Sequence, residues 1–234
     1  MSLPVHCSSI LFNEPFGTVN DFTVSFTYTM DTSGTDPQFN QGFSVFFVDG
    51  NVTTLSGGGA GPGLGVVSTG GSPGRPQPVS SPQGLFTILG FDIAGNFSHV
   101  NSIRPFTTGN AIVVPNSIGL RISPNYSFVG SQYVYPINPY LYGPLGPTQS
   151  PEAYQTVRVS VRKNFTEILV HSLDNETYTL LATFNFYISS LPETAKFGIS
   201  YSGDTLFEVQ NITVNSTWLY SVIYIINNII SIWL

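Results

Sequence analysis

Apolar and polar residues alternate along short segments over much of the chain. Residues 22–28 are apolar at every second position, and residues 157–162 repeat the alternation. A period of two places the apolar side chains on one face, so each segment predicts a half-buried β-strand. Stretches rich in Gly, Pro, Asn and Asp separate these segments, which is typical of an all-β sandwich or barrel.

The same pattern predicts a meander of hairpins in the second half of the chain. Lys163 and Asn164 form one predicted turn, and Asp174, Asn175 and Glu176 form another. The strands expected around and after these turns are residues 167–171, 178–184, 196–203 and 207–214.

Two earlier segments are more continuously apolar. Residues 42–48 end at the turn signal Asp49-Gly50, and residues 84–92 end at a single acid, Asp92. Between them, residues 56–84 are rich in Gly, Pro and Ser, and a short strand is expected inside this stretch at residues 63–67. The rest of the stretch is either a loop or a rim where small residues let a ligand approach the backbone.

Composition narrows the class of partner. Charged residues are only 9% of the 234 residues, hydrophobic residues are 41%, and the net charge is −6 with seven Lys and Arg. This balance argues against nucleic-acid binding, because phosphate contacts need clustered basic residues. A polar but uncharged surface favours sugars or neighbouring protein subunits. Cys7 is the only cysteine, so packing must stabilise the fold without an intramolecular disulfide.

The order of these segments resembles the L-type, legume-lectin-like family. The similarity lies in "NQGFSVFFVDG", "GPGLGV", "GLFTILGFDIAGNF" and "NSIGLRIS", and in the closing hairpins up to "GISYSGDT". The resemblance covers about residues 10–217 and implies an all-β, concanavalin A-like jelly-roll sandwich of two antiparallel sheets. We therefore expect a lectin-like domain over residues 1–217, followed by an apolar tail over 218–234. A looser similarity, to lectin-like proteins of large DNA viruses and phages, implies a place on a virion or particle surface.

The resemblance also implies a metal-bearing strand, which this chain keeps in part. Asp92 and Asn96 match the family's Asp and the Asn four residues later, whereas Gly90 stands where the family has Glu. One carboxylate and one amide hold a divalent cation weakly. The prediction is therefore no cofactor, with Ca²⁺ at Asp92 and Asn96 as the alternative. In the absence of metal, Asp92 is expected to cap the turn by accepting backbone N–H bonds near Gly95.

The carbohydrate site implied by the family is altered as well. Gln41 takes the place of the family's sugar-binding Asp, Gly63 matches a backbone donor, and Asn96 serves both the turn and the sugar. An amide still bonds sugar hydroxyls, without the charge-assisted part. Glycans are the expected partner.

An enzyme is not expected. Glucanases on this scaffold use two Glu residues on the strand that here reads Gly90-Phe91-Asp92-Ile93, and both are missing. Asp174 and Glu176 are interpreted as solvated turn residues.

The tail, "WLYSVIYIINNIISIWL" (218–234), carries no charge. Its pattern permits a helix with one polar face, and its β-branched content equally permits a strand. It is interpreted as a contact with self or virion subunits, as an internal core element, or as a membrane anchor. The Tyr- and Pro-rich loop 132–151 suits stacking on sugar or packing against a subunit.

Two functions therefore remain open. The first is a non-enzymatic, glycan-binding module on a particle surface. The second is a structural capsid or assembly protein that uses a degenerate lectin fold for subunit contacts.

Overall fold

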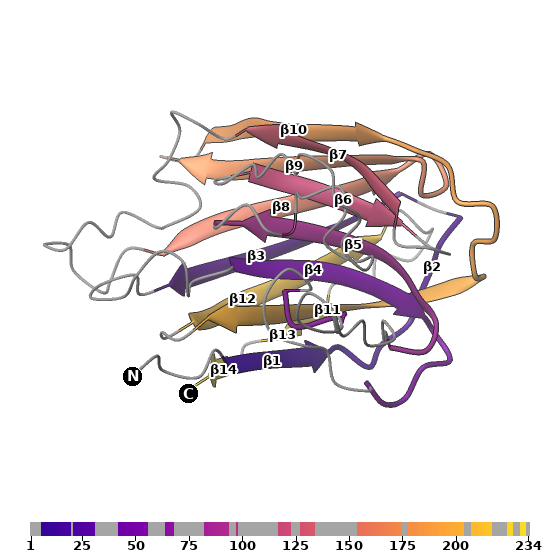
Figure 1. The fold of residues 1–234 in the computed structure, drawn as a ribbon, viewed down its shortest axis with the longest axis horizontal. Coiled ribbons are helices and arrows are strands. Elements are labelled where there is room, and N and C mark those ends of the chain that lie inside the picture. Colours follow the sequence, from indigo (N-terminus) through magenta and orange to yellow (C-terminus); the bar gives the residue numbers. More distant parts are fainter. Residues whose placement is uncertain are drawn as a thin grey trace, which may run out of the picture.

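The structure, a computed structural model of the chain, describes residues 6–19, 21–30, 42–55, 64–67, 82–93, 97, 117–122, 127–133, 154–174, 177–203, 207–216, 224–226 and 230–232. Figure 1 shows the strands of this part of the chain running along the long axis of the molecule. Their bounds are β1 (His6–Leu11), β2 (Phe16–Gly17), β3 (Phe22–Met30), β4 (Gly42–Asp49), β5 (Leu85–Asp92), β6 (Ser117–Ile122), β7 (Ser127–Tyr133), β8 (Gln155–Arg162), β9 (Glu167–Asp174), β10 (Thr177–Asn185), β11 (Thr194–Gly203), β12 (Phe207–Ser216), β13 (Tyr224–Ile226) and β14 (Ile230–Ile232).

The strands form two antiparallel sheets. Sheet A has the order β1-β11-β4-β5-β6-β7, and β2 also pairs with β11. Sheet B has the order β10-β9-β8-β3-β12-β13, and β14 also pairs with β12. The prediction of an all-β sandwich of two antiparallel sheets is confirmed. The predicted meander is confirmed too, because β8, β9 and β10 pair in sequence order.

The strands expected from alternation coincide with β3, β8, β9, β10, β11 and β12, and the two apolar segments form β4 and β5. The short strand expected at residues 63–67 is wrong over its described part, because residues 64–67 form a turn. Leu64 and Gly65 have φ angles of 47° and 80°, which a β-strand does not use. The turn is nevertheless attached to sheet A, since the Ser200 hydroxyl donates to the Leu64 carbonyl oxygen at 2.5 Å.

The main core lies between the two sheets and is rich in aromatic rings. Phe43 on β4 stacks on Phe91 of the neighbouring strand β5, with ring centroids 4.3 Å apart. Across the sandwich, Phe43 meets Phe26 of β3 edge-on at 6.2 Å and Tyr28 at 4.6 Å. These contacts join the sheets through the side chains that alternation places on their inner faces.

A second apolar layer covers the outer face of sheet A, which is the face turned away from sheet B. It contains Phe46 and Ile88 from the sheet, together with Leu64 and Phe97 from the connecting segments. The central strands are therefore buried on both faces, and every described residue of β5 is buried. This explains why residues 42–48 and 84–92 read as nearly continuous apolar runs instead of alternating.

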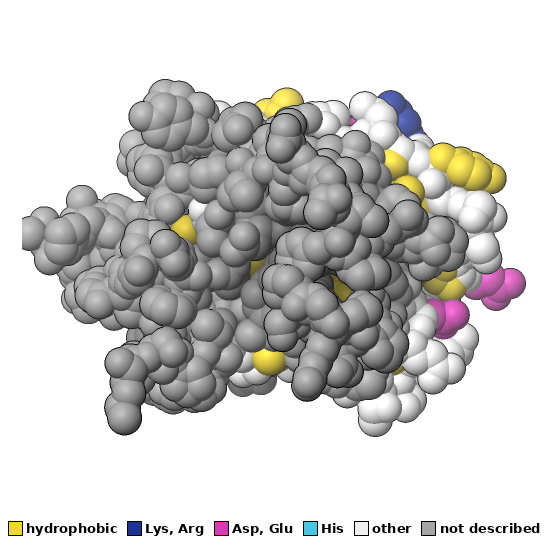
Figure 2. Space-filling view, in the orientation of Figure 1, with side chains coloured by type: hydrophobic (Ala, Val, Ile, Leu, Met, Phe, Trp, Pro, Cys, Tyr) yellow, Lys and Arg dark blue, Asp and Glu magenta, His cyan; other side chains and the backbone are white. Residues whose placement is uncertain are grey.

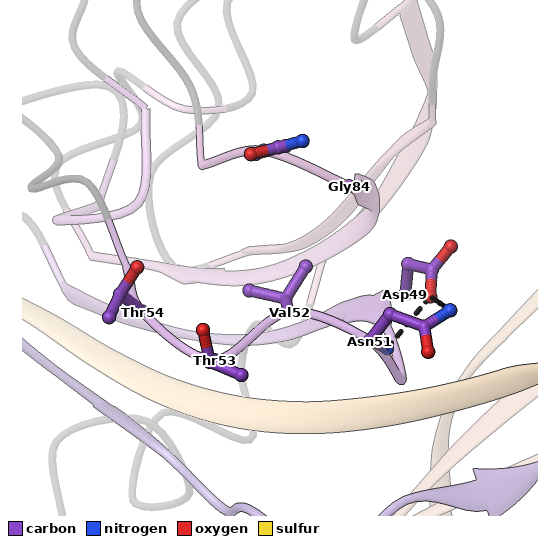
Figure 3. A pocket seen from close by; sticks show the side chains of 7 residues that line it. Asp49, Asn51, Val52, Thr53, Thr54 and Gly84 are labelled. Atoms are coloured by element: carbon purple, nitrogen blue, oxygen red, sulfur yellow. Dashed lines mark hydrogen bonds between the residues drawn. The ribbon is translucent and has the colours of Figure 1, made fainter.

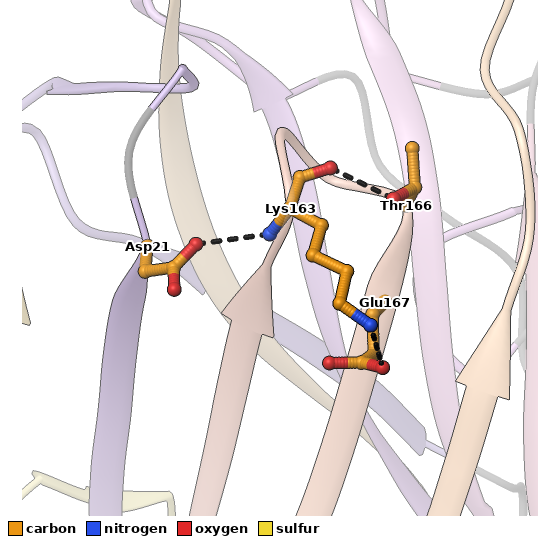
Figure 4. Close-up of polar contacts among 4 residues, drawn as sticks. All are labelled: Asp21, Lys163, Thr166 and Glu167. Carbon is orange, nitrogen blue, oxygen red and sulfur yellow. Dashed lines mark hydrogen bonds and ion pairs between the residues drawn. The ribbon is translucent and has the colours of Figure 1, made fainter.

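The predicted turn at Lys163 is present between β8 and β9, and Figure 4 shows how it is held. Lys163, Asn164 and Phe165 all have positive φ angles, an uncommon conformation for residues with side chains. The backbone N–H of Lys163 donates to Asp21 at 2.9 Å, and its carbonyl accepts from the Thr166 hydroxyl at 2.7 Å. Phe165 is buried in the core, so packing and hydrogen bonds together hold the turn.

The tail forms strands in its described part. β13 and β14 pair antiparallel with β12 at the edge of sheet B, opposite the side that pairs with β3. Within the residues that can be described, no helix has the length and apolar character needed to cross a membrane. The predicted boundary between a sandwich and a separate tail at residue 217 falls outside the described residues and stays a prediction.

Candidate functional site

Three neighbouring strands of sheet A begin or end side by side. β4 begins at Gly42, β5 ends at Asp92 and β6 begins at Ser117, and Asp92 is paired with both of the other two residues. Gly42 has a φ of 121°, and a side chain there would overlap the Phe91 carbonyl group. Only glycine fits at this position, which gives a structural reason for the glycine that leads the apolar segment. We call this end of the three strands the Asp92 end.

Of the predicted site residues, Asp92 is described, whereas Gln41, Gly63 and Asn96 lie outside the described residues. Their neighbours in sequence are described and come together at the Asp92 end. Gly42 follows Gln41 and pairs with Asp92.

Leu64 follows Gly63, and Phe97 follows Asn96. Both lie against the Cα of Gly90, where an added Cβ would be 2.8 Å from the Leu64 side chain and 2.5 Å from the Phe97 ring. Chain segments that are far apart in sequence thus converge around Gly90, near the C-terminal end of β5.

Sequence reasoning missed a buried cation at this end. Arg121 on β6 is only 1% exposed, and Asp92 is 0% exposed. The pairs Ile88–Arg121, Gly90–Gly119 and Asp92–Ser117 follow one another along β5 and β6, so their side chains share the outer face of sheet A. The only signal in the sequence was a lone basic residue inside the apolar segment "NSIGLRIS".

The Arg121 guanidinium contacts the segment that follows β5. Its Nη2 atom donates to the carbonyl oxygen of Phe97 at 2.7 Å, and its Cζ atom lies 5.1 Å from the centroid of the Phe97 ring. Burial lowers the pKa of Arg121 to about 10, and the Asp92 carboxylate acts in the opposite direction. The guanidinium is therefore charged at neutral pH.

The described surroundings of Asp92 do not fit a divalent cation. The position of the family's glutamate, Gly90, is covered by the Phe97 ring, and the buried Arg121 guanidinium already interacts electrostatically with Asp92. Among the described residues, no three His, Cys, Asp or Glu side chains gather as a metal-binding group. The alternative of Ca²⁺ at Asp92 and Asn96 stays a prediction, since Asn96 lies outside the described residues.

The opposite end of β4 and β5 carries a polar pocket of about 190 Å³. It is lined by Asp49, Asn51, Val52, Thr53, Thr54, Gln83 and Gly84 (Figure 3). Asp49 accepts two hydrogen bonds of 2.9 Å, from the backbone N–H and the side-chain amide of Asn51. Lys196 is 6% exposed, and its amine donates to the Val52 carbonyl at 2.8 Å, which holds this segment on the sheet. We call this edge the Asp49 end.

Charge is sparse on the surface as well. Arg121 and Lys196 are buried, which leaves five of the seven basic residues for any surface. In Figure 2 the charged side chains on the described part of one face lie in small groups among uncharged ones. The described part of this face therefore offers neutral hydrogen-bonding groups more than a field for charged ligands.

No protein-family model matches the chain, and no curated protein matches its sequence. Its fold is similar to that of legume lectins. Lectin I-B4 from Griffonia simplicifolia, in a metal-free form, is 16% identical with a TM-score of 0.55, over 90% of this chain and 80% of the lectin. Peanut lectin, solved with a nine-residue peptide, is 21% identical with a TM-score of 0.51, over 87% and 77%. Lectin I from Ulex europaeus, in complex with the methyl glycoside of α-L-fucose, is 16% identical with a TM-score of 0.52, over 88% and 78%. At these identities the likeness shows the concanavalin A-like fold alone.

Proposed function

We propose that the protein is a non-enzymatic, lectin-like module that binds glycans at the Asp92 end. The observation that carries the proposal is the convergence of Gly42, Leu64 and Phe97 around β5. Each of them is the next residue after one of the three predicted sugar-binding residues. The likeness to lectins, one of them solved with a fucoside, supports the same assignment.

Asp92 has a supporting role in this proposal. Its side chain is 0% exposed, so it cannot present a carboxylate to a sugar in this arrangement. The direct contacts then fall to the amides of Gln41 and Asn96 and to the backbone of Gly63. Neutral amide–hydroxyl bonds contribute less than charge-assisted ones, so we expect weak binding of single sugars and a need for multivalent display.

A glycan array tests this proposal, with the purified protein displayed multivalently in the presence and absence of Ca²⁺. We expect saturable binding to a subset of glycans, reduced at least about tenfold by Gln41→Ala or Asn96→Ala, since about 1.4 kcal/mol corresponds to a factor of ten. Asn51→Ala, at the Asp49 end, is the matched control and should leave binding unchanged. Absence of binding across the array, or equal loss in all three variants, would contradict a site at the Asp92 end.

We also propose that the module lies on the surface of a particle such as a virion. This part rests on the loose resemblance expected from the sequence alone, and the comparisons with known proteins add no support to it. Labelling of intact purified particles with an antibody against the chain tests it. Labelling only after the particles are disrupted would contradict a surface location.

A second candidate function, structural assembly, is favoured by the tail. β13 and β14 occupy an edge of sheet B, and edge strands offer unpaired backbone groups to another chain. Light scattering of the full chain and of a chain ending at residue 217 separates the candidates. If the protein assembles through its tail, the full chain should form oligomers that dissociate when the tail is removed. A purely glycan-binding module should have the same oligomeric state with and without the tail.

A further inference from the structure

Asp92 and Arg121 are two buried ionisable side chains on neighbouring strands, and the charge of Asp92 raises the pKa of Arg121 against the effect of burial. Burying a single charge without a partner is costly, whereas an opposite charge nearby offsets part of that cost. Both side chains lie on the outer face of sheet A, in the register set by the pairing of β5 with β6. Their backbones are four residues apart along that register, about 13 Å at about 3.3 Å per residue. At this separation a positive charge on β6 comes near Asp92 only if its side chain is long and extends along the sheet, as that of Arg121 can.

The residues between them leave room for that reach. Gly90 and Gly119 face each other between the Ile88–Arg121 and Asp92–Ser117 pairs, so no side chain from either strand occupies the gap. The Phe97 ring fills the space above Gly90, and the guanidinium lies over that ring. The aromatic face and the Phe97 carbonyl both favour a cation at this place.

We propose that Arg121 takes the place of a metal ion at the Asp92 end. Its buried guanidinium provides a fixed positive charge beside Asp92 and holds the carbonyl of Phe97, so this end of the sandwich forms without a divalent cation. A divalent cation entering here would meet a charge pair that is already neutral, and would be repelled by the guanidinium. This inference concerns folding and does not depend on whether glycans bind.

The first experiment compares thermal unfolding of the full chain in EDTA, in Ca²⁺ and in Mn²⁺, without any sugar. We expect the same melting temperature in all three conditions. An ion that binds only the folded chain stabilises it more as the ion concentration rises above its dissociation constant, so a rise of several degrees with Ca²⁺ or Mn²⁺ would overturn the proposal.

The second experiment is a double-mutant cycle in urea between Arg121→Met and Asp92→Asn. In the wild-type background we expect Arg121→Met to lower the urea midpoint by about 1 M or more. In the Asp92→Asn background the same change should cost less than half as much, because the carboxylate charge that interacts with Arg121 has already been removed. Equal losses in both backgrounds would make Arg121 a simple anchor of Phe97 and would overturn the proposal.

Lys196→Met provides the matched control. It also removes a buried cation that donates to a backbone carbonyl, that of Val52, but it lies at the Asp49 end. The decrease in the urea midpoint caused by Lys196→Met should be the same with or without Asp92→Asn. If Arg121→Met does not fold, Arg121→Lys enters the cycle instead. Because lysine keeps the charge, Arg121→Lys is expected to retain part of the coupling to Asp92, and absence of any coupling would count against the proposal.

Discussion

At both ends of the β4–β5 pair a connecting segment is anchored to sheet A, but the acidic residue is placed differently. At each end a buried cation from a neighbouring strand holds the carbonyl of a connecting segment: Arg121 binds that of Phe97, and Lys196 binds that of Val52. The ends differ in the acid. Asp92 is buried beside the cation, whereas Asp49 is partly exposed, bonds to Asn51 and lines a polar pocket.

This difference shows what a buried acid contributes to a scaffold. The Asp49 end keeps its carboxylate near solvent, where it organises its own turn. The Asp92 end places its carboxylate in the interior, where its charge interacts with a buried cation that the chain itself supplies. The acid at that end therefore supports the sheet edge, and any ligand must be bound by other groups.

The largest difference between the ends, in the free energy of unfolding, is expected when an acidic residue is introduced at one end or the other. Gly90→Glu introduces the residue that legume-type lectins have at the corresponding position, but its Cβ would lie 2.5 Å from the Phe97 ring and its charge would be buried. We expect a loss of about 4 kcal/mol in the free energy of unfolding, from overpacking and an uncompensated charge. Gln83→Glu, at the exposed Asp49 end, should change it by less than about 0.5 kcal/mol. Urea denaturation measures both, and similar losses would remove the contrast between the ends.

Truncating Phe97 and Val52, whose carbonyls accept from Arg121 and Lys196, should lower the free energy of unfolding by different amounts at the two ends. Phe97 is fully buried, covers Gly90 and contacts Arg121, so Phe97→Ala should cost about 3 to 4 kcal/mol. Val52 is partly buried against the same outer layer, and Val52→Ala should cost about 1 kcal/mol. Thermal and urea unfolding give both values. A larger loss for Val52→Ala would show that the Asp49 end is the better packed one.

Removing the acids themselves tests the contrast directly. Asp92→Ala leaves Arg121 buried without its acidic neighbour, and we expect a loss of about 3 kcal/mol. Asp49→Ala removes two hydrogen bonds in a turn open to solvent, with an expected loss of about 1 kcal/mol. Calorimetric unfolding of the two variants at the same pH measures the difference, and equal losses would mean that burial of Asp92 has no energetic consequence.

The smallest effect is a background pH dependence from sheet B. Burial, and then Arg158 and Arg162, lower the pKa of His171 below its ordinary value of 6.5. The unfolded chain then binds a proton more readily than the folded one, so stability is complete above the unfolded pKa and falls as pH drops below it. His171→Gln should reduce this loss by less than about 1 kcal/mol, because His171 is partly exposed. Urea midpoints at about pH 7 and 5 measure it, and the contrast between the two ends should be unchanged in this variant.

Much of the strand content was predictable from the sequence. The alternation at residues 22–28 and 157–162 marks β3 and β8, and the apolar runs at 42–48 and 84–92 mark β4 and β5. The prediction failed at Leu64, where the Gly-rich segment forms a turn whose apolar side chains cover the sheet. A short apolar stretch between glycines has the composition of either structure, and contacts with distant strands decide between them.

The candidate site was predicted only in part. Asp92 was identified by its place at the end of an apolar strand, and it lies where three strand ends meet. Arg121 was missed because its partners are Phe97, 24 residues away in sequence, and Asp92, on the neighbouring strand. Nothing in the local pattern around Arg121 indicates which face it shares with which residue.

Alternation and turn composition are local properties, so the order of residues was enough to specify strands, hairpins and a sandwich with little surface charge. The partners of a buried charge depend on the register between strands and on which segment covers which face. Only the assembled sheets set Gly90 opposite Gly119, lay Phe97 over the gap and bring Arg121 to Asp92. A buried charge has a different energy in each such arrangement, which is why its role could be read only from the folded molecule.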